Sequence, residues 1–586
     1  MPSTQKPDSS IAGVAMRGAG PAALLLVAAV VLVCLTMPPA PDGPRFAGAG
    51  NTRPTRGGTF VFFHESDIRS LDPQVAYDEI SNMAIKLLFE GLLDYDHDAN
   101  LVPRLATAMP DVTADGRTFV FTLRRGVRFH NGRELVAEDV RWSMEHMLAA
   151  STNSPGATFY SLIDGIDAYQ AGHARHIRGI RVLERYKISF TLTAADQTFL
   201  NAMAMTFAYP VARENYARWD ETEVARHPVG TGAYTLDTWE AGVRLTFTRN
   251  PRYFRPGEPY PNGMVFELNL TREAAFRRFR NGQIDHIHRL TPADYLFVRS
   301  APKWAATRQE YPLVDVWGLS MNCELPPFDN VHVRRAVAFA LDRERWNRAR
   351  AYRLITTGQP VPPALMGYSR DLPERQTFDL ARAREEMRLA GHPDGVPGEI
   401  SLWIGEGATG RVYGELAQSD LAKIGIHIRI KPVAFPVYLQ ETGKRRTAQL
   451  VFSGWSMDFP DPANFLDILF HSRSIHESNS ENKSFYSNPT LDALLDRAKI
   501  ERDRPARAAM YRQASSIIAH DAPWAFINNS KQTEVWQPYV RNYQPHPVWS
   551  NLYRDVWLDE PRRRIAERLG AFGRSRLAVL LPFGGL

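Results

Sequence analysis

The stretch SLWIGEGATGRVYGELAQSDLAKIGIHIRIKPVAFPVYLQETGKRRTAQLVFSG (401–454) decides the fold class. Apolar runs and alternation predict three strands in it, at Leu402–Ile404, Ile426–Ile430 and Leu450–Ser453. The segment 411–424, between the first two strands, predicts a helix. Such an order is typical of a mainly parallel sheet that helices cover on both faces. Because open sheets of this kind bind ligands beyond the carboxyl ends of their strands, the loop after Ser453 is a candidate site.

The chain on either side of this stretch predicts more strands and helices. A strand is expected within Ala241–Asn250, with three apolar residues on one face: Val243, Leu245 and Phe247. Apolar residues at helical spacing from Val333 to Leu341 predict an amphipathic helix. Another helix is expected to begin at Phe378 and to end at Gly391, a residue suited to a C-terminal cap. The predicted class is therefore α/β.

Length and composition are those of a large globular protein. The chain has 586 residues, several times the usual size of one domain. Its 44% of apolar and 23% of charged residues exclude a mostly disordered chain and a polytopic membrane protein. The formal net charge is only +6, and no stretch forms a basic arm. The charge therefore gives no argument for nucleic acid as a partner.

The sequence contains no motif of catalysis or of metal binding. HExxH, GxSxG and P-loop patterns are all missing, and the two cysteines, Cys34 and Cys323, exclude a disulfide scaffold and a Cys-rich metal site. The pairs His173/His176 and His286/His288 offer two imidazoles each, which do not complete a metal site and are more often solvated surface. We therefore expect a protein that is not an enzyme and that carries neither a cofactor nor a metal.

Residues 1–37 have the pattern of a signal peptide or N-terminal anchor. Lys6 and Arg17 precede the uncharged apolar run Pro21–Met37. Residues 38–58 are rich in Pro, Gly and Ala and indicate a flexible linker. The body of the protein is therefore expected in the periplasm or another extracytoplasmic space.

Three outcomes are open for this leader. Cys34 is a candidate for lipid attachment, although the preceding Val33 is larger than the residue such a signal prefers. Cleavage after Ala47-Gly48-Ala49 is the second outcome, and retention as a membrane anchor is the third. All three carry the body across the inner membrane.

Several stretches of the chain together resemble the family 5 extracellular solute-binding proteins of ABC transporters, the dipeptide and oligopeptide group. The stretches are SLDPQVAYDEISNMAIKLLFEGLLDYD (70–96), ADGRTFVFTLRRGVRFHNGRELVAEDVRWSM (114–144), HPVGTGAYTLDTW (227–239), MNCELPPFDNVHVRRAVAFALDRE (321–344), GWSMDFPDPANF (454–465) and FYSNPTLDALLDRA (485–498). Each is moderately specific, and they follow one another in the order of the family.

The resemblance implies a two-lobed periplasmic-binding-protein fold of type II, with an extra subdomain in the first lobe and the ligand cleft between the lobes. It places lobe I at 59–312 with the inserted subdomain at about 97–190, lobe II at 313–528, and a return to lobe I at 529–560. The remaining residues, 561–586, lie outside the resemblance. They form a basic and then apolar tail, which suits either an anionic membrane surface or a solvated end.

In peptide-binding members of this family a carboxylate on the loop GWSMDFPDPANF holds the amino terminus of the ligand, and the matching residue is Asp458. The chemistry is sensible, because an ammonium that loses water in a closed cleft requires a charged partner. The alternative is that Asp458 caps a local turn before Pro460. Asp461, before Pro462, is the better candidate for a structural role in this loop.

Three more residues are candidates for ligand binding. Trp455 can stack on a ligand or pack in the core, and Arg411 can meet a ligand carboxylate or remain an exposed helix residue. Dipeptide binders of the family have an arginine in the stretch that corresponds to 403–407. Here the charged residue is Glu406. This departure suits longer peptides, or a cationic solute that is not a peptide.

The expected function is that of a solute receptor for an ABC importer, which captures short peptides and delivers them to permease subunits. Its other expected contact is with the membrane, through the N-terminal segment, and the expected state is a monomer. Alternatives are a receptor for a non-peptide solute (a nickel complex, an opine or an oligosaccharide), a sensor with the same fold, or an exported hydrolase.

Overall fold

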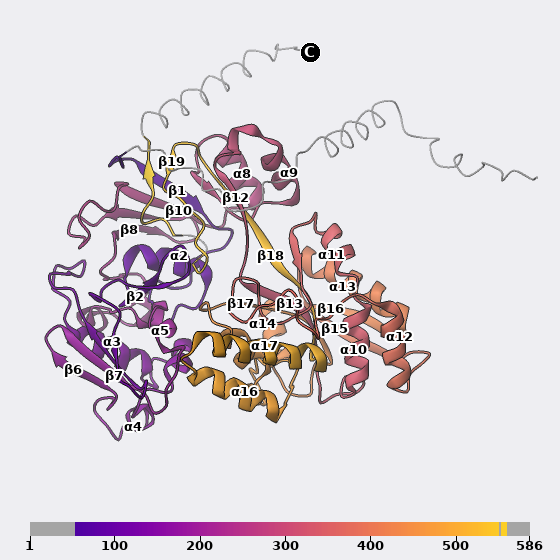
Figure 1. The fold of residues 1–586 in the computed structure, drawn as a ribbon. Coiled ribbons are helices and arrows are strands. Elements are labelled where there is room, and N and C mark those ends of the chain that lie inside the picture. The colour runs from indigo at the N-terminus through magenta and orange to yellow at the C-terminus, as the bar shows by residue number, and fades with distance from the viewer. Residues whose placement is uncertain (1–52, 550–551, 560–586) are drawn as a thin grey trace, which may run out of the picture.

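Two lobes lie side by side in the computed structural model, which describes residues 53–549 and 552–559 (Figure 1). Lobe I contains the elements near the N-terminus, and lobe II contains most of the chain after residue 315. The predicted α/β class and the two-lobed architecture are confirmed. The predicted leader, most of the linker and the predicted tail lie outside the described residues.

Lobe I is built on a four-stranded sheet of order β1-β10-β9-β8. The strands are β1 (Thr59–Phe63), β10 (Gly263–Glu267), β9 (Arg244–Arg249) and β8 (Tyr234–Glu240). β1 and β10 are parallel, and the other pairs are antiparallel. Leu245 and Phe247 are buried in β9 as predicted. Val243 was predicted to share their face, but it lies before the strand and is 50% exposed, because the hairpin turn of Glu240–Val243 occupies this position.

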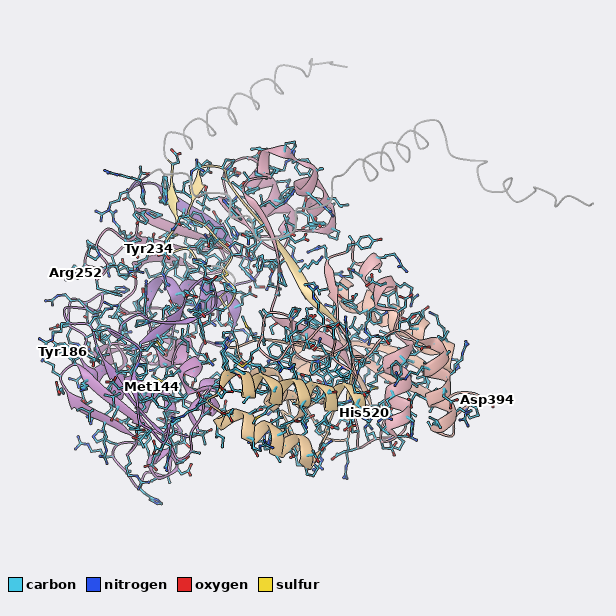
Figure 2. All side chains as sticks on the ribbon, viewed as in Figure 1. Met144, Tyr186, Tyr234, Arg252, Asp394 and His520 are labelled. Atoms are coloured by element: carbon cyan, nitrogen blue, oxygen red, sulfur yellow. The ribbon has the colours of Figure 1, made fainter. Side chains whose placement is uncertain are left out.

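A second sheet of lobe I has the order β4-β5-β7-β6 and lies within residues 111–191. Its strands are β4 (Asp111–Val112), β5 (Thr118–Thr122), β7 (Lys187–Thr191) and β6 (Ile180–Glu184). Helix α3 (Ala137–Leu148) packs on this sheet, and Met144 on α3 is fully buried in its core. Figure 2 shows Met144 in this part of lobe I and Tyr234 in the part built on β1 and β8.

Several shorter elements join these two sheets. They are α2 (Glu79–Leu88), β2 (Leu93–Tyr95), β3 (Leu101–Pro103), α4 (Ile166–Gln170), α5 (Phe199–Ala202), α6 (Arg213–Arg218), α7 (Glu221–Val224), β19 (Val540–Arg541) and β20 (Trp557–Leu558). Helices α8 (Arg272–Arg280) and α9 (Pro292–Ser300) pack together beside β11 (His286–Ile287) and β12 (Arg308–Pro312). Asp78 caps α2 by accepting from the Ser81 amide, which fixes the start of this helix at the lobe boundary.

The sheet of lobe II is mixed rather than mainly parallel. Its strands are β18 (Trp524–Trp536), β13 (Asp315–Met321), β17 (Leu450–Ser456), β15 (Glu399–Gly405), β16 (His427–Val433) and β14 (Leu354–Thr356). The predicted strands of residues 401–454 pair in parallel as β16-β15-β17. β13 is antiparallel to both β17 and β18, however, so the prediction for the whole sheet was wrong. β13 is the reversed strand, because β18 runs in the same direction as β17, β15 and β16.

Helices cover both faces of this sheet, as the sequence predicts. One face carries α10 (Val331–Ala340), α11 (Arg343–Ala349), α12 (Leu380–Leu389) and α13 (Ala408–Leu421). The other carries α14 (Phe435–Thr442), α15 (Ala463–Phe470), α16 (Pro489–Ile500) and α17 (Arg504–Asp521). Alternation along β15 sets the two faces, since Leu402 belongs to the first core and Trp403 to a cluster with α14.

The strand β18 connects the lobes. Its first half pairs with β13 and β14 in lobe II, and its second half pairs with β11 and β12 on the side of α8 and α9. Figure 1 shows it as a long yellow strand between these regions. The predicted boundary at 528–529 falls inside this strand. Among the residues described here, no helix is long and apolar enough to cross a membrane.

Candidate functional site

The loop after β17 holds the carboxylate of Asp458 in a fixed position. Asn464, fully buried in the first turn of α15, organises this loop. Its Oδ1 accepts from the Asp458 amide (2.8 Å) and from Trp455 Nε1 (3.2 Å), and its Nδ2 donates to Asp458 Oδ2 (2.9 Å). The partners of the Asp458 carboxylate in the described chain are therefore side chains, which does not fit the alternative of a cap on a local turn.

Tyr77 brings lobe I to this carboxylate. Its hydroxyl donates a short hydrogen bond to Asp458 Oδ1, although the residue as a whole is 47% exposed. Burial raises the pKa of Asp458, and the bonds from Asn464 and Tyr77 offset part of this effect. A carboxylate in such surroundings gains from a nearby cation, and its two oxygens keep lone pairs that a ligand ammonium can use.

A cavity of about 390 Å³ opens beside this pair, and we name it the anchor cavity. Tyr77 and Phe207 line it from lobe I, and Val314 and Met457 line it from lobe II. Its acidic residues are Asp78, Glu79, Asp315 and Asp458, against Lys86 and Arg289 as cations. The cavity therefore lies between the lobes, and its wall is suited to a positively charged group.

The ammonium of Lys86 is held by aromatic neighbours. Its Nζ donates to the hydroxyl of Tyr209 (2.9 Å) and lies 3.2 Å from the centre of the Trp549 ring. Burial lowers the pKa of Lys86 to about 7, although Asp94 and Glu90 act in the opposite direction. The Lys86 ammonium is therefore already engaged by Tyr209 and Trp549 at the wall of the anchor cavity.

A second cavity, of about 530 Å³, lies on the other side of the Tyr77–Asp458 contact, and we name it the side cavity. Trp455 lines it and is half-buried, with part of its ring packed on the core beneath β17. Phe159 and Leu162 of lobe I face it from the opposite wall. Trp455 is thus placed both to pack in the core and to touch a ligand side chain.

Glu406 and Arg411 lie apart from Asp458. Both are exposed, Glu406 at the end of β15 and Arg411 in the first turn of α13. Neither lines the anchor cavity or the side cavity, and α13 contributes Thr409 and Tyr413 to a further cavity of about 200 Å³. Of the four predicted residues, the structure therefore brings together Asp458 and Trp455 only.

Asp461 has the structural role that the sequence predicts for it. Its carboxylate accepts from Arg507 Nη1 (2.7 Å) and Nη2 (2.9 Å), and both side chains are buried. It also accepts from the Ala463 amide (3.0 Å), which caps the turn into α15. The two aspartates of this loop thus differ in surroundings: Asp458 faces the cavities, and Asp461 is paired in the core.

The histidine pairs differ from one another. His173 and His176 are exposed, as expected. His286 and His288 are not solvated surface, since both are buried, and His286 Nε2 lies 3.0 Å from Glu534 Oε2. Within residues 53–549 and 552–559, no group of three or more potential ligands could hold a metal ion.

Sequence reasoning missed Tyr77 and Asn464. Asn464 lies within the stretch GWSMDFPDPANF, and an amide side chain one turn into a helix behind two prolines is a signal that the loop needs internal hydrogen bonds. Tyr77 is separated from Asp458 by 381 positions, and the sequence carries no signal of their contact.

Comparison with known proteins agrees with this geometry. Residues 100–477 match the family described as bacterial extracellular solute-binding proteins, family 5 middle. A di/tripeptide-binding protein of Pseudomonas aeruginosa is 26% identical over 488 residues, which cover 80% of this chain and 89% of the relative.

Two solved structures share the fold over most of their length. An oligopeptide-binding protein of clavulanic acid biosynthesis superimposes with a TM-score of 0.79 at 25% identity, over 88% of this chain and 98% of the other. The periplasmic binding protein DppA of Helicobacter pylori, solved with the peptide STSA, gives a TM-score of 0.72 at 26% identity, over 86% and 99%.

Proposed function

Since the chain belongs to family 5 of the bacterial extracellular solute-binding proteins, we propose that it captures short peptides between its lobes as the receptor of an ABC importer. One observation carries the proposal. Asp458, on a rigid loop of lobe II, presents its carboxylate to a cavity that both lobes line. Peptide binding by the relatives and the solved structures supports the same assignment.

The ligand ammonium bonds to Asp458, and the peptide chain extends along the cleft. Because Tyr77 approaches Asp458 from lobe I, a ligand at this position touches both lobes at once. Contacts that exist only when the lobes are together shift the equilibrium toward the closed form. β18, which belongs to both lobes, is the element that bends in this motion.

Delivery follows from this cycle. The closed, loaded receptor docks on permease subunits outside the cytoplasm and releases its solute there. We propose that the N-terminal segment keeps the receptor at the membrane and that it acts as a monomer. The protein binds its peptide without breaking it, so it has no catalytic residue.

The test is thermal unfolding of the purified full-length protein with a pool of tri- and tetrapeptides and with the same pool after N-acetylation. A peptide present at about 100 times its Kd stabilises the folded protein by about 2.7 kcal/mol. We expect a rise in Tm with the free pool and none with the acetylated pool. No rise with either pool would show that peptides are not the solute.

Two further measurements separate the alternatives. Recovery of intact peptide after prolonged incubation, measured by mass spectrometry, is expected for a receptor, whereas cleavage would support a hydrolase. Co-purification with an ABC permease is expected after cross-linking in membranes. Co-purification with a membrane kinase would instead support a sensor.

A further inference from the structure

The cavity next to the anchor cavity is strongly basic, and we name it the basic cavity. It encloses about 200 Å³ and shares Arg289, Leu313 and Gln532 with the anchor cavity, so the two are continuous. Five cations line it, and no aspartate or glutamate does: Arg272, Arg289, Arg350, Arg353 and Lys531. The cleft thus changes from acidic to basic along its length.

Three of these cations already have acidic partners. Arg272 makes a two-fold contact with Glu65 (2.5 and 2.6 Å), Arg289 bonds to Glu79, and Lys531 Nζ lies 4.0 Å from Glu310. Arg350 and Arg353, from the end of α11 and the start of β14, have no carboxylate within 4.0 Å among the described residues. The cavity therefore carries about two positive charges that the protein does not compensate.

Arg353 lies in surroundings that disfavour its charge, and Arg350 lacks a partner for one of its donors. Burial, and then the neighbouring Arg350, lower the pKa of Arg353. Arg350 Nε is buried and has no hydrogen-bond partner in the described chain. Both observations mean that an anion would stabilise this region.

An aromatic stack fixes the wall of the basic cavity. Trp317 stacks on Phe452, with ring centres 5.7 Å apart, and Phe452 stacks on Tyr413 at 4.6 Å. The guanidinium of Arg350 lies over the Tyr413 ring, 5.6 Å from its centre. A planar guanidinium held in this way presents its donors in the fork geometry that carboxylates accept.

The distance between the anchor cavity and the basic cavity follows from strand β17, which contributes a residue to each. Ser456 lines the anchor cavity and Phe452 lines the basic cavity. Four residues of a strand span about 13 Å at roughly 3.3 Å per residue. An extended peptide advances by about 3.3–3.6 Å per residue, so about four residues join the two ends.

We propose that the basic cavity selects peptides of about four residues that end in an acidic residue, whose two carboxylates meet Arg350 and Arg353. This inference rests on the proposed function, because it takes Asp458 as the anchor of the ammonium. A dipeptide anchored at Asp458 is too short to reach the two arginines.

The test compares Ala-Ala-Ala-Glu with Ala-Ala-Ala-Gln by calorimetry on the purified full-length protein. The two peptides differ by one charge at nearly the same shape, and we expect the glutamate peptide to bind at least tenfold more tightly. Ala-Glu should bind at least tenfold more weakly than Ala-Ala-Ala-Glu. Equal affinities for the two tetrapeptides would overturn the inference and leave the proposed function standing, whereas no binding of any peptide would overturn both.

Variants assign the preference to the two arginines. In Arg350→Gln/Arg353→Gln the glutamate peptide should lose at least tenfold more affinity than the glutamine peptide, so that the preference disappears. Arg348→Gln, an exposed position on the same helix, is the matched control and should keep it. A preference that survives the double substitution would overturn the assignment, and the peptide comparison decides the inference even if the double variant does not fold.

Discussion

The hydroxyl of Tyr77 in lobe I donates to the carboxylate of Asp458 in lobe II, across 381 positions of sequence. Each residue is held by its own lobe, Asp458 by Asn464 and Tyr77 by the turn that leads to Asp78, the N-cap of α2. The contact therefore reports the approach of the two lobes at the point where the anchor cavity meets the side cavity. In the proposed complex, a ligand ammonium would share this carboxylate with Tyr77.

Replacing Asp458 by Asn is expected to weaken peptide binding by at least tenfold. The substitution removes a charge-assisted hydrogen bond to the ligand ammonium, which contributes about 1.5–3 kcal/mol. Calorimetry with a tetrapeptide measures the change, and the unliganded variant should be at least as stable as the original protein. Unchanged affinity would show that Asp458 is not the anchor.

Asp461 provides the contrasting substitution in the same loop. Asp461→Ala leaves Arg507 buried without its partner, which costs about 3–5 kcal/mol of unfolding free energy. Chemical denaturation of the unliganded protein measures this loss. A variant that kept its stability would contradict the structural role of the pair.

Peptide affinity is expected to fall as the pH decreases toward the pKa of Asp458. Burial raises this pKa, so protonation begins at a higher pH than for an ordinary aspartate, and a protonated carboxyl cannot hold an ammonium ionically. Tyr77→Phe removes a donor to the charged form, so the pH of half-maximal binding should move upward. Titrations between about pH 4 and pH 7 measure both effects, and an unchanged midpoint in Tyr77→Phe would contradict this role of the hydroxyl.

The carboxyl of Asp458 affects stability in the opposite way: a higher pH favours peptide binding but lowers the contribution of this group to folding. Because its pKa is higher in the folded state than in the unfolded chain, Asp458 takes up a proton on folding. Its contribution to the stability of the unliganded protein therefore decreases as the pH rises above the ordinary aspartate pKa. In denaturation experiments, Asp458→Asn should gain stability relative to the original protein over that range.

Gly454→Ala is expected to displace Trp317 and to damage the basic cavity. A Cβ at position 454 would lie 2.2 Å from the Trp317 ring, which crosses the paired strand at this position. Overpacking of this kind costs about 1–3 kcal/mol, and the affinity for an acidic tetrapeptide should fall with it. Gly405→Ala on a neighbouring strand is the control, since a Cβ there meets nothing within 4 Å. Equal behaviour of the two variants would contradict the packing argument.

Arg554→Ala should destabilise lobe I by about 3–5 kcal/mol. Arg554 Nη1 bonds to Asp94 Oδ2 (2.5 Å), and both side chains are buried. Although burial alone would raise it, the pKa of Asp94 is held low by Arg554 and then by Lys86. Arg244→Ala, which breaks an exposed pair with Glu240, should change the stability by less than about 1 kcal/mol. Thermal and chemical denaturation of the two variants check the difference.

The sequence predicted local elements well and their directions less well. Residues 401–454 form the strands and the helix that their apolar patterns predict, because these patterns reflect which side chains face the core. The antiparallel β13 was missed because it lies outside residues 401–454, and no local pattern records the direction in which a strand enters the sheet.

For the site, the sequence supplied the loop and its residues but not its partners. Asp458 and Trp455 lie within one short stretch that a pattern can single out. The other residues that line the cavities, Tyr77, Arg350 and Arg353, are far from Asp458 in sequence, and no local pattern singles them out. The cavities that these residues line form only when the chain packs, so the folded structure is needed to find them.

The shared strand β18 also constrains how the protein is made. A growing polypeptide reaches Trp524 late, and until then β13 has no neighbour on one side and β11 and β12 have no strand to pair with. Thr55 is likewise bonded to the carbonyl of Leu558, near the other end of the described chain (2.8 Å). Contacts of such long sequence separation form slowly. Neither half can therefore be completed before β18 has been made, and both are completed in one late, joint step.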